Sequence, residues 1–150
     1  METLKTITPH LAVAGQPTES DLKTLRDQGY VGVINLRNDG EPEQPITTKE
    51  EGELAKKLGL EYLHYGVGGA PFSRDGVEAV YDFLDRHPSE KVLVHCRSGG
   101  RAQAILLLFE ARKRGWSASD AITNGRGMGL DVKGGLAAMV EQYLAANPHT

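Results

Sequence analysis

The one cysteine of this sequence is surrounded by residues of the types that hold an anion and attack it. The segment reads His95-Cys96-Arg97-Ser98-Gly99-Gly100-Arg101 and directly follows the apolar residues Val92-Leu93-Val94. A thiolate is a nucleophile, glycines let main-chain N–H groups surround an oxyanion, and an arginine binds such an anion through paired donors. The segment therefore predicts a nucleophile loop, residues 96–101, in which Cys96 attacks a bound anion and Arg101 holds it.

This chemistry requires the Cys96 thiol to ionise at neutral pH. A free cysteine has a pKa near 8.5, and lowering it by about three units takes roughly 4 kcal/mol of stabilisation. A helix dipole contributes at most about 2 kcal/mol, so the rest must come from loop N–H groups and from the charges of Arg101 and Arg97. The simpler alternative is a cysteine packed as a small apolar residue, which Ser98 and the two glycines beside it disfavour.

The histidine before the cysteine is predicted to support the loop. His95 ends an apolar strand, where an imidazole can hydrogen-bond its surroundings and hold the loop in shape. The other histidines are scattered along the chain and predict no metal site; they are His10, His64, His87 and His149. We expect no cofactor.

Three further arginines are candidates for a pocket that takes an anionic substrate. These are Arg37, Arg74 and Arg126, the last standing between two glycines. Each of them could equally be a solvated surface charge. The sequence does not choose between the two interpretations.

Composition limits the classes of partner. The chain has 150 residues, 39% of them apolar, and a formal net charge of −3 at pH 7, which predicts one domain over residues 1–150. It has no basic stripe for nucleic acid, and its longest apolar run, Ala104–Phe109, is too short to cross a membrane. The first residues lack an export signal and one cysteine cannot form an internal disulfide, so we expect a cytoplasmic protein. The oligomeric state is left open.

Apolar runs and capping residues define the elements that must position the nucleophile loop. Strands are expected at 11–14, 31–36, 60–65 and 92–95. Helices are expected from Thr18 or Ser20 to 28, from Thr47 or Thr48 to 58, from Ser73 to 86, and over 101–114, 119–124 and 136–146. Glycines at 125, 127 and 129 predict a flexible loop.

Strands that alternate with single helices imply crossover connections. The expected fold is α/β, with a mostly parallel sheet of four to five strands flanked by helices on both faces. Gly40, the group Gly66–Gly69 and the pair Gly99–Gly100 all follow the carboxyl end of a strand. Ligands of open α/β sheets bind at that edge, so the nucleophile loop is predicted to lie there.

Two sets of residues carry a resemblance to known families. His95-Cys96-x-x-Gly99 with a later arginine resembles the signature of cysteine-dependent protein tyrosine and dual-specificity phosphatases. Ile7–Pro17 and Val33–Arg37 resemble a bacterial family of phosphatase-like domains described as beta-lactamase-hydrolase-like. The resemblance implies a dual-specificity-phosphatase-like fold and a small phosphorylated or anionic substrate. It makes Cys96 the residue that becomes phosphorylated, with the anion held by Arg101 and the amides of residues 97–101.

Three departures from the phosphatase pattern leave the reaction open. Four residues separate Cys96 from Arg101 where the phosphatase motif has five, and Ala102 stands where those enzymes carry a hydroxyl. The segment expected to hold a general-acid aspartate reads Gly68-Gly69-Ala70-Pro71. Asp75 is the nearest carboxylate and the candidate acid, although its position just after Ser73 is better explained as a favourable charge at a helix N-terminus. The shorter loop resembles that of rhodanese-type sulfurtransferases. The alternatives are therefore sulfur transfer through a Cys96 persulfide and a non-catalytic domain that binds an anion or a phosphorylated partner.

Overall fold

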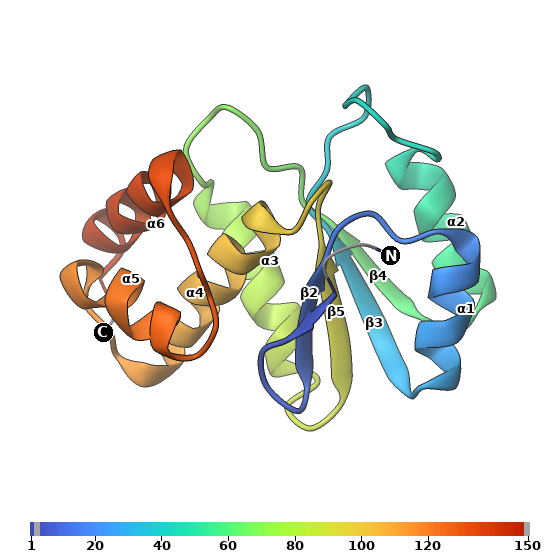
Figure 1. Cartoon of the computed structure of the whole chain (residues 1–150), viewed down its shortest axis with the longest axis horizontal. Helices are drawn as coiled ribbons and strands as arrows, with labels where there is room; N and C mark the ends of the chain where they lie inside the picture. The colour runs from blue at the N-terminus through green and yellow to red at the C-terminus, as the bar shows by residue number, and fades with distance from the viewer. Residues whose placement is uncertain (2–3, 149–150) are drawn as a thin grey trace.

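The computed structural model describes residue 1 and residues 4–148, which form a twisted sheet with helices on its two faces (Figure 1). The strands are β1 (Lys5–Thr6), β2 (Leu11–Ala14), β3 (Tyr30–Asn35), β4 (Glu61–His64) and β5 (Lys91–His95). The helices are α1 (Glu19–Asp27), α2 (Thr48–Lys57), α3 (Arg74–Asp85), α4 (Gly100–Arg114), α5 (Ala118–Gly127) and α6 (Gly134–Ala146). The predicted α/β class is confirmed.

The sheet order places the nucleophile loop at its centre. The order is β1-β2-β5-β3-β4, and β5 pairs in parallel with both β2 and β3. The strand that leads into Cys96 therefore has a neighbour on each side. Only β1 runs antiparallel, on the edge next to β2. This strand was not predicted, because its two exposed residues carry no alternation of apolar and polar side chains.

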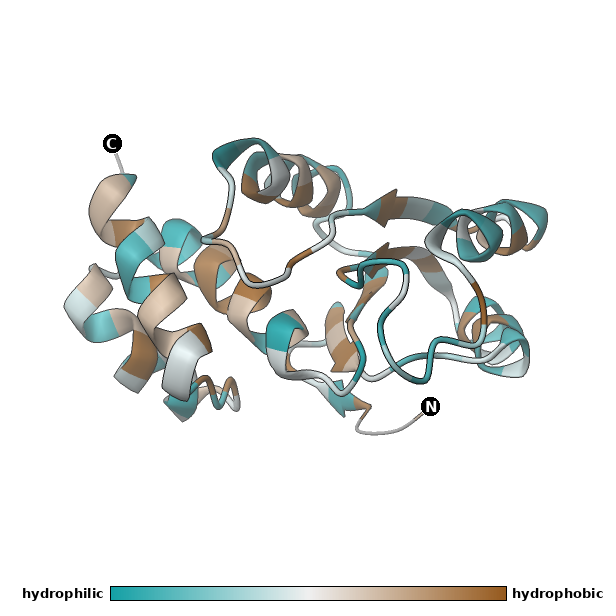
Figure 2. Ribbon diagram, turned by 90° about the horizontal axis from the view of Figure 1, so that it is seen from above, coloured by the Kyte–Doolittle hydropathy of each residue, from teal (hydrophilic) through white to brown (hydrophobic). Residues whose placement is uncertain are grey.

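Two apolar cores lie on opposite faces of the sheet. Helices α1 and α2 cover one face, where Leu22, Leu25 and Ala55 pack against strand residues such as Val33. Helices α3 and α4 cover the other face, and α5 and α6 pack outside α4 (Figures 1 and 2). The middle of α4 is buried on every side, as expected of a helix that is apolar all round.

Three of the predicted capping residues begin helices, and at α1 and α2 the structure selects one of the two candidates. Thr18 and Thr47 form capping boxes at α1 and α2, and Ser73 caps α3. Each side-chain oxygen accepts from a main-chain N–H group that has no partner within its helix. Helix α5 begins after Ser117 and runs through Gly125 and Gly127. The predicted flexible loop at these glycines is therefore wrong up to residue 127, since tertiary packing overrides their low helix propensity.

The carboxyl edge of the sheet gathers the segments that surround the nucleophile. Residues 15–17 follow β2, 36–47 follow β3, 65–73 follow β4 and 96–99 follow β5. These segments lie together at the top of the molecule in Figure 1. Within the described part of the chain, no helix is long and apolar enough to cross a membrane.

Candidate active site

The nucleophile loop is fixed from both sides by the strands next to β5. The Cys96 N–H donates to the Ala14 carbonyl of β2 at 3.2 Å. On the other side, the Leu36 N–H donates to the His95 carbonyl at 2.9 Å. These bonds continue the parallel ladder one residue beyond the strands, so the backbone on which Cys96 stands is held firmly.

The loop curls back over the cysteine and then becomes a helix. Gly99 has a φ of 102°, a left-handed conformation that favours glycine, and α4 begins at the next residue. The Gly99 N–H donates to the Cys96 Sγ at 3.0 Å, and Cys96 is only 1% exposed. Of the N–H groups predicted to surround the nucleophile, that of Gly99 therefore points at the sulfur.

Arg101 stands in the first turn of α4, and its guanidinium group is held in one orientation. Its Nη1 donates to Glu41 Oε2 at 2.8 Å and to the Val67 carbonyl at 2.8 Å, while its Nη2 donates to Glu41 Oε1 at 2.8 Å. An arginine has five N–H donors. The Nε–H and the second Nη2–H lie together on the remaining edge, and that edge can bind an anion with two parallel bonds.

The charges of this site stabilise one another. Hydrogen bonds with Arg101 lower the pKa of Glu41 to about 2, against the opposing effect of its burial, and the Asn38 N–H adds to the lowering. Hydrogen bonds with Glu41 raise the pKa of Arg101, burial opposes this, and interaction with the Cys96 side chain raises it further. At neutral pH, the site thus contains an ionised Glu41 and a charged Arg101 that also contacts the nucleophile.

Arg37 builds the acid loop, which we define as residues 37–45, and it does not face an anion pocket. The side chain is fully buried. Its guanidinium donates to Glu41 Oε1 at 3.2 Å, to the Pro42 carbonyl at 2.7 Å, to the Glu43 carbonyl at 3.3 Å and to Gln16 Oε1 at 2.9 Å. Arg37 is therefore neither a pocket arginine nor a solvated surface charge, because loop carbonyls and side chains bind its donors.

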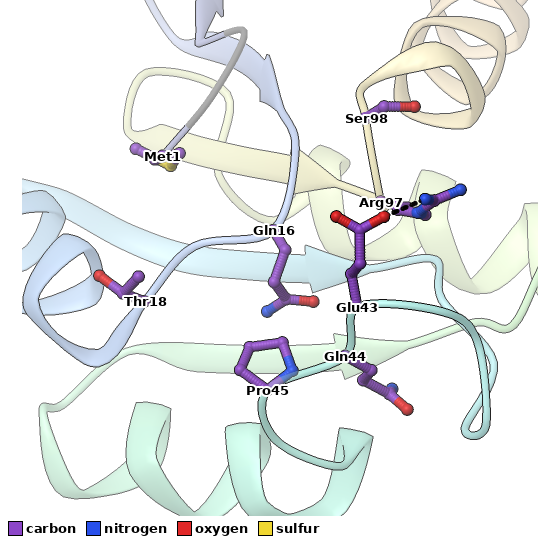
Figure 3. A pocket seen from close by; sticks show the side chains of 8 residues that line it. All are labelled: Met1, Gln16, Thr18, Glu43, Gln44, Pro45, Arg97 and Ser98. Carbon is purple, nitrogen blue, oxygen red and sulfur yellow. Dashed lines mark hydrogen bonds and ion pairs between the residues drawn. The ribbon is translucent and has the colours of Figure 1, made fainter.

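Arg97 lies on the open side of the loop, beside a cavity of about 730 Å³. Its side chain is 46% exposed and forms an ion pair with Glu43 of the acid loop (Figure 3). Glu43 has a φ of 57°, which is unusual for a residue other than glycine. Gln16 and Ser98 also line this cavity. The acid loop thus supplies one carboxylate to each arginine of the nucleophile loop.

His95 is completely buried and belongs to a polar chain beneath the nucleophile. Its Nε2 lies 2.6 Å from Glu51 Oε2, and its Nδ1 lies 3.3 Å from the Cys96 carbonyl oxygen. The other oxygen of Glu51 accepts from Gln16 Nε2 at 2.7 Å. Gln16 also accepts from Arg37. Four buried or half-buried side chains therefore connect the acid loop to the carbonyl of Cys96.

The hydrogen bonds of His95 determine how many protons the His95–Glu51 pair carries in total. A carbonyl oxygen only accepts, so Nδ1 must carry a proton to bond Cys96. The short contact between Nε2 and Glu51 needs a second proton. The pair is therefore either imidazolium with carboxylate or imidazole with carboxylic acid, and it is neutral in both cases. Because a peptide C=O and the following N–H point in opposite directions, holding the Cys96 carbonyl orients the Arg97 N–H.

The remaining predicted residues stand on helices α3 and α5. Asp75 is in the first turn of α3, two residues after the cap Ser73. Arg74 lines a separate groove with Glu78 and Tyr143, between α3 and α6. Arg126 is on α5, 60% exposed and 4.0 Å from Asp131. The structure therefore joins neither Arg74 nor Arg126 to the nucleophile loop.

Within the residues described, no group of three histidine, cysteine, aspartate or glutamate side chains is placed to hold a metal ion. Of the histidines considered in the sequence, His149 lies outside the described residues. His64 contacts the Arg37 carbonyl, and His87 contacts Glu61 and Glu90.

Four residues of this site were not found from sequence: Gln16, Glu41, Glu43 and Glu51. The position of the acid loop could have been predicted, because it follows the strand next to β5 and must lie at the same carboxyl edge of the sheet as the nucleophile loop. Arginines of a buried loop also need counter-charges. Glu51 gave no signal, since it reads as one of several acids in the first turns of a polar helix.

A parallel sheet with a cysteine–arginine loop after its central strand defines a protein with a protein tyrosine phosphatase-like fold. The structure of Tk-PTP in its active form superposes with a TM-score of 0.76 at 22% identity, covering 97% of each chain. A DUF442 protein from Shewanella putrefaciens CN-32 also gives 0.76, at 25% identity over 99% of this chain and 95% of that one.

The sequence comparison then assigns the family. A model of the family described as beta-lactamase hydrolase-like protein, phosphatase-like domain, matches residues 3–113, and the chain belongs to this family. A beta-lactamase hydrolase-like protein from Agrobacterium fabrum is 32% identical over 144 residues. The alignment covers 95% of this chain but 33% of that protein, so the chain spans about a third of the length of this relative. A beta-lactamase hydrolase-like protein from Xylella fastidiosa is also 32% identical, and the alignment covers 84% of this chain and 29% of that protein.

Proposed function

We propose that the chain is a cysteine-dependent phosphatase that hydrolyses phosphate monoesters through a cysteinyl-phosphate on Cys96. The Cys96 Sγ attacks phosphorus, an S–P bond forms and the P–O bond to the leaving group breaks. Water then attacks the same phosphorus, which releases phosphate and restores the thiolate. The orientation of Arg101 is the observation that carries the proposal, because Glu41 and Val67 bind three of its donors while the same guanidinium interacts with the Cys96 side chain, where the phosphoryl group would be attacked.

The proposed roles follow from the geometry of the loop. The N–H groups of residues 97–101 and Arg101 bind the phosphoryl oxygens, and Glu41 positions Arg101 through its two-oxygen contact. His95 and Glu51 hold the Cys96 carbonyl. These contacts favour charge that develops on the phosphoryl group in the transition state.

The proposal limits the range of substrates. Glu41 is ionised at neutral pH because its pKa is about 2, so it has no proton for a leaving group. Asp75 is the proposed acid, from the first turn of α3. Where Asp75 contributes little, only esters with good leaving groups react readily. Aryl phosphates are therefore expected to be better substrates than alkyl phosphates, and Asp75→Asn is expected to widen that difference.

A paired assay separates the proposed reaction from its alternatives. Hydrolysis of p-nitrophenyl phosphate and transfer of sulfur from thiosulfate to cyanide are measured for the wild type, Cys96→Ser and Arg101→Lys. We expect phosphate release that Cys96→Ser abolishes and that Arg101→Lys reduces at least 100-fold, in the range of losses for a transition-state donor. Arg26→Ala, at an exposed arginine of α1, is the control for loss of a positive charge and is expected to keep full activity.

The other outcomes contradict the proposal. Thiocyanate formation without phosphate release identifies the chain as a rhodanese-type sulfurtransferase. Activity in neither assay, with phosphate binding that depends on Arg101, identifies a binding domain without turnover.

We propose further that residues 1–150 act as one phosphatase-like domain. The mechanism needs Cys96 in its reduced form, which fits a reducing compartment such as the cytoplasm. Limited proteolysis of the purified chain should leave one resistant fragment that includes both Glu41 and Cys96.

A further inference from the structure

Gln16 contacts the nucleophile loop with its backbone and reaches the acid loop with its side chain. It follows β2 at the carboxyl edge of the sheet, and its main-chain N–H donates to the Arg97 carbonyl at 3.3 Å. Just before it, Gly15 forms an isolated antiparallel bridge with Ser98. Figure 3 shows the Gln16 side chain extending from this segment toward Pro45 of the acid loop. The residue therefore lies between the two loops that build the site.

The side-chain amide of Gln16 is bound at both its nitrogen and its oxygen. The Nε2 group donates to Glu51 Oε1 at 2.7 Å and to the Pro17 carbonyl at 3.1 Å, and Oε1 accepts from Arg37 Nη1 at 2.9 Å. Exchanging the oxygen and the nitrogen would set donors against Arg37 and an oxygen against Glu51 Oε1. The contacts therefore require an amide in one orientation, which donates on one side and accepts on the other.

The donating side of this amide supports the start of the nucleophile loop. Glu51 contacts His95 Nε2 through its other oxygen at 2.6 Å, and His95 Nδ1 lies 3.3 Å from the Cys96 carbonyl oxygen. The direction of that carbonyl sets the direction of the next N–H group in the loop. Gln16 is thus connected to the first peptide of the loop through two side chains.

The accepting side supports the arginine at the end of the nucleophile loop. Besides donating to Gln16, Arg37 donates to Glu41 Oε1 at 3.2 Å. Glu41 in turn binds Arg101 through both of its oxygens, each at 2.8 Å. Groups that share one hydrogen-bond network respond to changes in one another. A change at Arg101 can therefore reach the opposite end of the loop through Gln16.

We propose that Gln16 is a positioning residue that couples the two ends of the nucleophile loop, the Cys96 carbonyl and the Arg101 guanidinium. Its effect on rate rests on the proposed phosphatase reaction, whereas the coupling itself is a property of the folded chain. The loop N–H groups and Arg101 must surround the same phosphoryl group, so displacement of either end slows the reaction. An amide bound to both supports keeps the two ends in their relative positions.

Replacing Gln16 with methionine keeps the length of the side chain and removes its hydrogen bonds. With p-nitrophenyl phosphate, we expect Gln16→Met to lower kcat about tenfold. KM should change by less than about threefold, because Glu41 still binds Arg101. Gln103→Met is the matched control, since Gln103 is also half-buried but accepts from the Asp131 N–H. It should keep kcat within about twofold of the wild type.

A second measurement follows the coupling without using the reaction. The ¹⁵N signals of the His95 ring report on the proton that His95 shares with Glu51. Glu41 is four hydrogen bonds away from that ring, through Arg37, Gln16 and Glu51. We expect Glu41→Gln to move the His95 signals in the otherwise unchanged chain and to leave them in place when Gln16→Met is also present.

The outcomes separate the role of Gln16 from the proposed reaction. If the wild type releases phosphate and Gln16→Met behaves like Gln103→Met, the role of Gln16 is wrong and the reaction stands. If the wild type releases no phosphate, the reaction is wrong and the His95 signals alone decide the coupling. Signals that Glu41→Gln leaves unmoved overturn the coupling even where Gln16→Met does not fold, and so do signals that move equally in both backgrounds.

Discussion

Glu51 and Glu110 are two glutamates of equal burial at opposite edges of the sheet. Each is 1% exposed. At the carboxyl edge, both oxygens of Glu51 have partners, His95 on one and Gln16 on the other. At the amino edge, Glu110 binds Arg114 through one oxygen and leaves the other without a partner.

The difference lies in how many of the carboxylate oxygens have hydrogen-bond partners at each end of the sheet. A buried carboxylate is tolerated when each of its oxygens has a hydrogen-bond partner, and it then fixes those partners in place. Glu51 meets that condition and supports the backbone of Cys96 through His95. Glu110 does not meet it. The two ends of the sheet therefore differ in how completely a buried carboxylate is hydrogen-bonded within the described residues.

Replacing Glu51 with alanine should give the largest loss of stability. The change leaves His95 buried without its partner, and breaking a buried pair costs about 3–5 kcal/mol. Urea unfolding of Glu51→Ala measures this loss directly, and phosphate release should fall with it. A loss below about 1 kcal/mol would show that Glu51 does not support the nucleophile loop.

Glu51→Gln is the matched variant for that prediction. The glutamine amide can donate to His95 Nε2, which leaves Nδ1–H to donate to the Cys96 carbonyl as before. The orientation of the loop is kept while the extra proton of the pair is lost. We expect a loss of only about 1–2 kcal/mol and clearly more residual activity than in Glu51→Ala.

Glu41 gives the carboxyl edge its sensitivity to acid. Its pKa in the folded protein is about 2, below the ordinary value of 4.5, because Arg101 donates to both oxygens. Its contribution to stability is therefore complete above pH 4.5 and is lost as the pH falls toward 2. The Glu41 side chain is 17% exposed, and after allowance for solvent screening we expect about 1–2 kcal/mol.

Melting temperatures of the wild type and Glu41→Gln, measured from pH 7 down to pH 3, test this contribution. The two curves should approach each other as the pH falls, and Glu41→Gln should also bind phosphate more weakly because Arg101 loses its orientation. Curves that stay parallel over this range would contradict the role of Glu41.

The nucleophile loop and its position were predictable because they depend on local patterns. Apolar strands that alternate with capped helices specify a parallel sheet, and a parallel sheet brings its loops to one edge. His95, Cys96 and Arg101 are close in sequence, so their proximity in space needed no knowledge of tertiary structure. Thr18, Thr47 and Ser73 were identified by the same local logic.

The support of the loop was not predictable, because it depends on contacts between distant segments. Glu41 reaches Arg101 across 60 positions and Glu51 reaches His95 across 44. Arg37 was a candidate anion ligand because its interior contacts with residues 41–43 could not be read from the sequence. Its type and its place at the end of a strand fit either a pocket or an interior contact, and only the backbone path of residues 41–43 decides between them.

Glu110→Leu should have a much smaller effect on stability than Glu51→Ala. It removes a buried charge with an unsatisfied oxygen, and Arg114, which is 47% exposed, can turn to solvent. Replacing such a group with an apolar one is often neutral or stabilising, so we expect a change within about 1 kcal/mol. Urea unfolding of the two variants side by side tests the comparison. A loss of 3 kcal/mol or more in Glu110→Leu, typical of a broken buried pair, would mean that Glu110 is a structural group like Glu51.

His87 should give the smallest effect, at the amino edge and with the opposite dependence on pH. Hydrogen bonds with Glu90 and Glu61 raise its pKa above 6.5, with a partial opposing effect of burial. Its contribution is therefore complete below pH 6.5 and is lost as the pH rises through the raised value. Both glutamates are about half exposed, so the contribution should be about 0.5 kcal/mol. Unfolding at pH 6 and pH 9 should show this loss in the wild type and in Glu41→Gln, but not in His87→Gln. A loss that persists in His87→Gln would assign the alkaline dependence to another group.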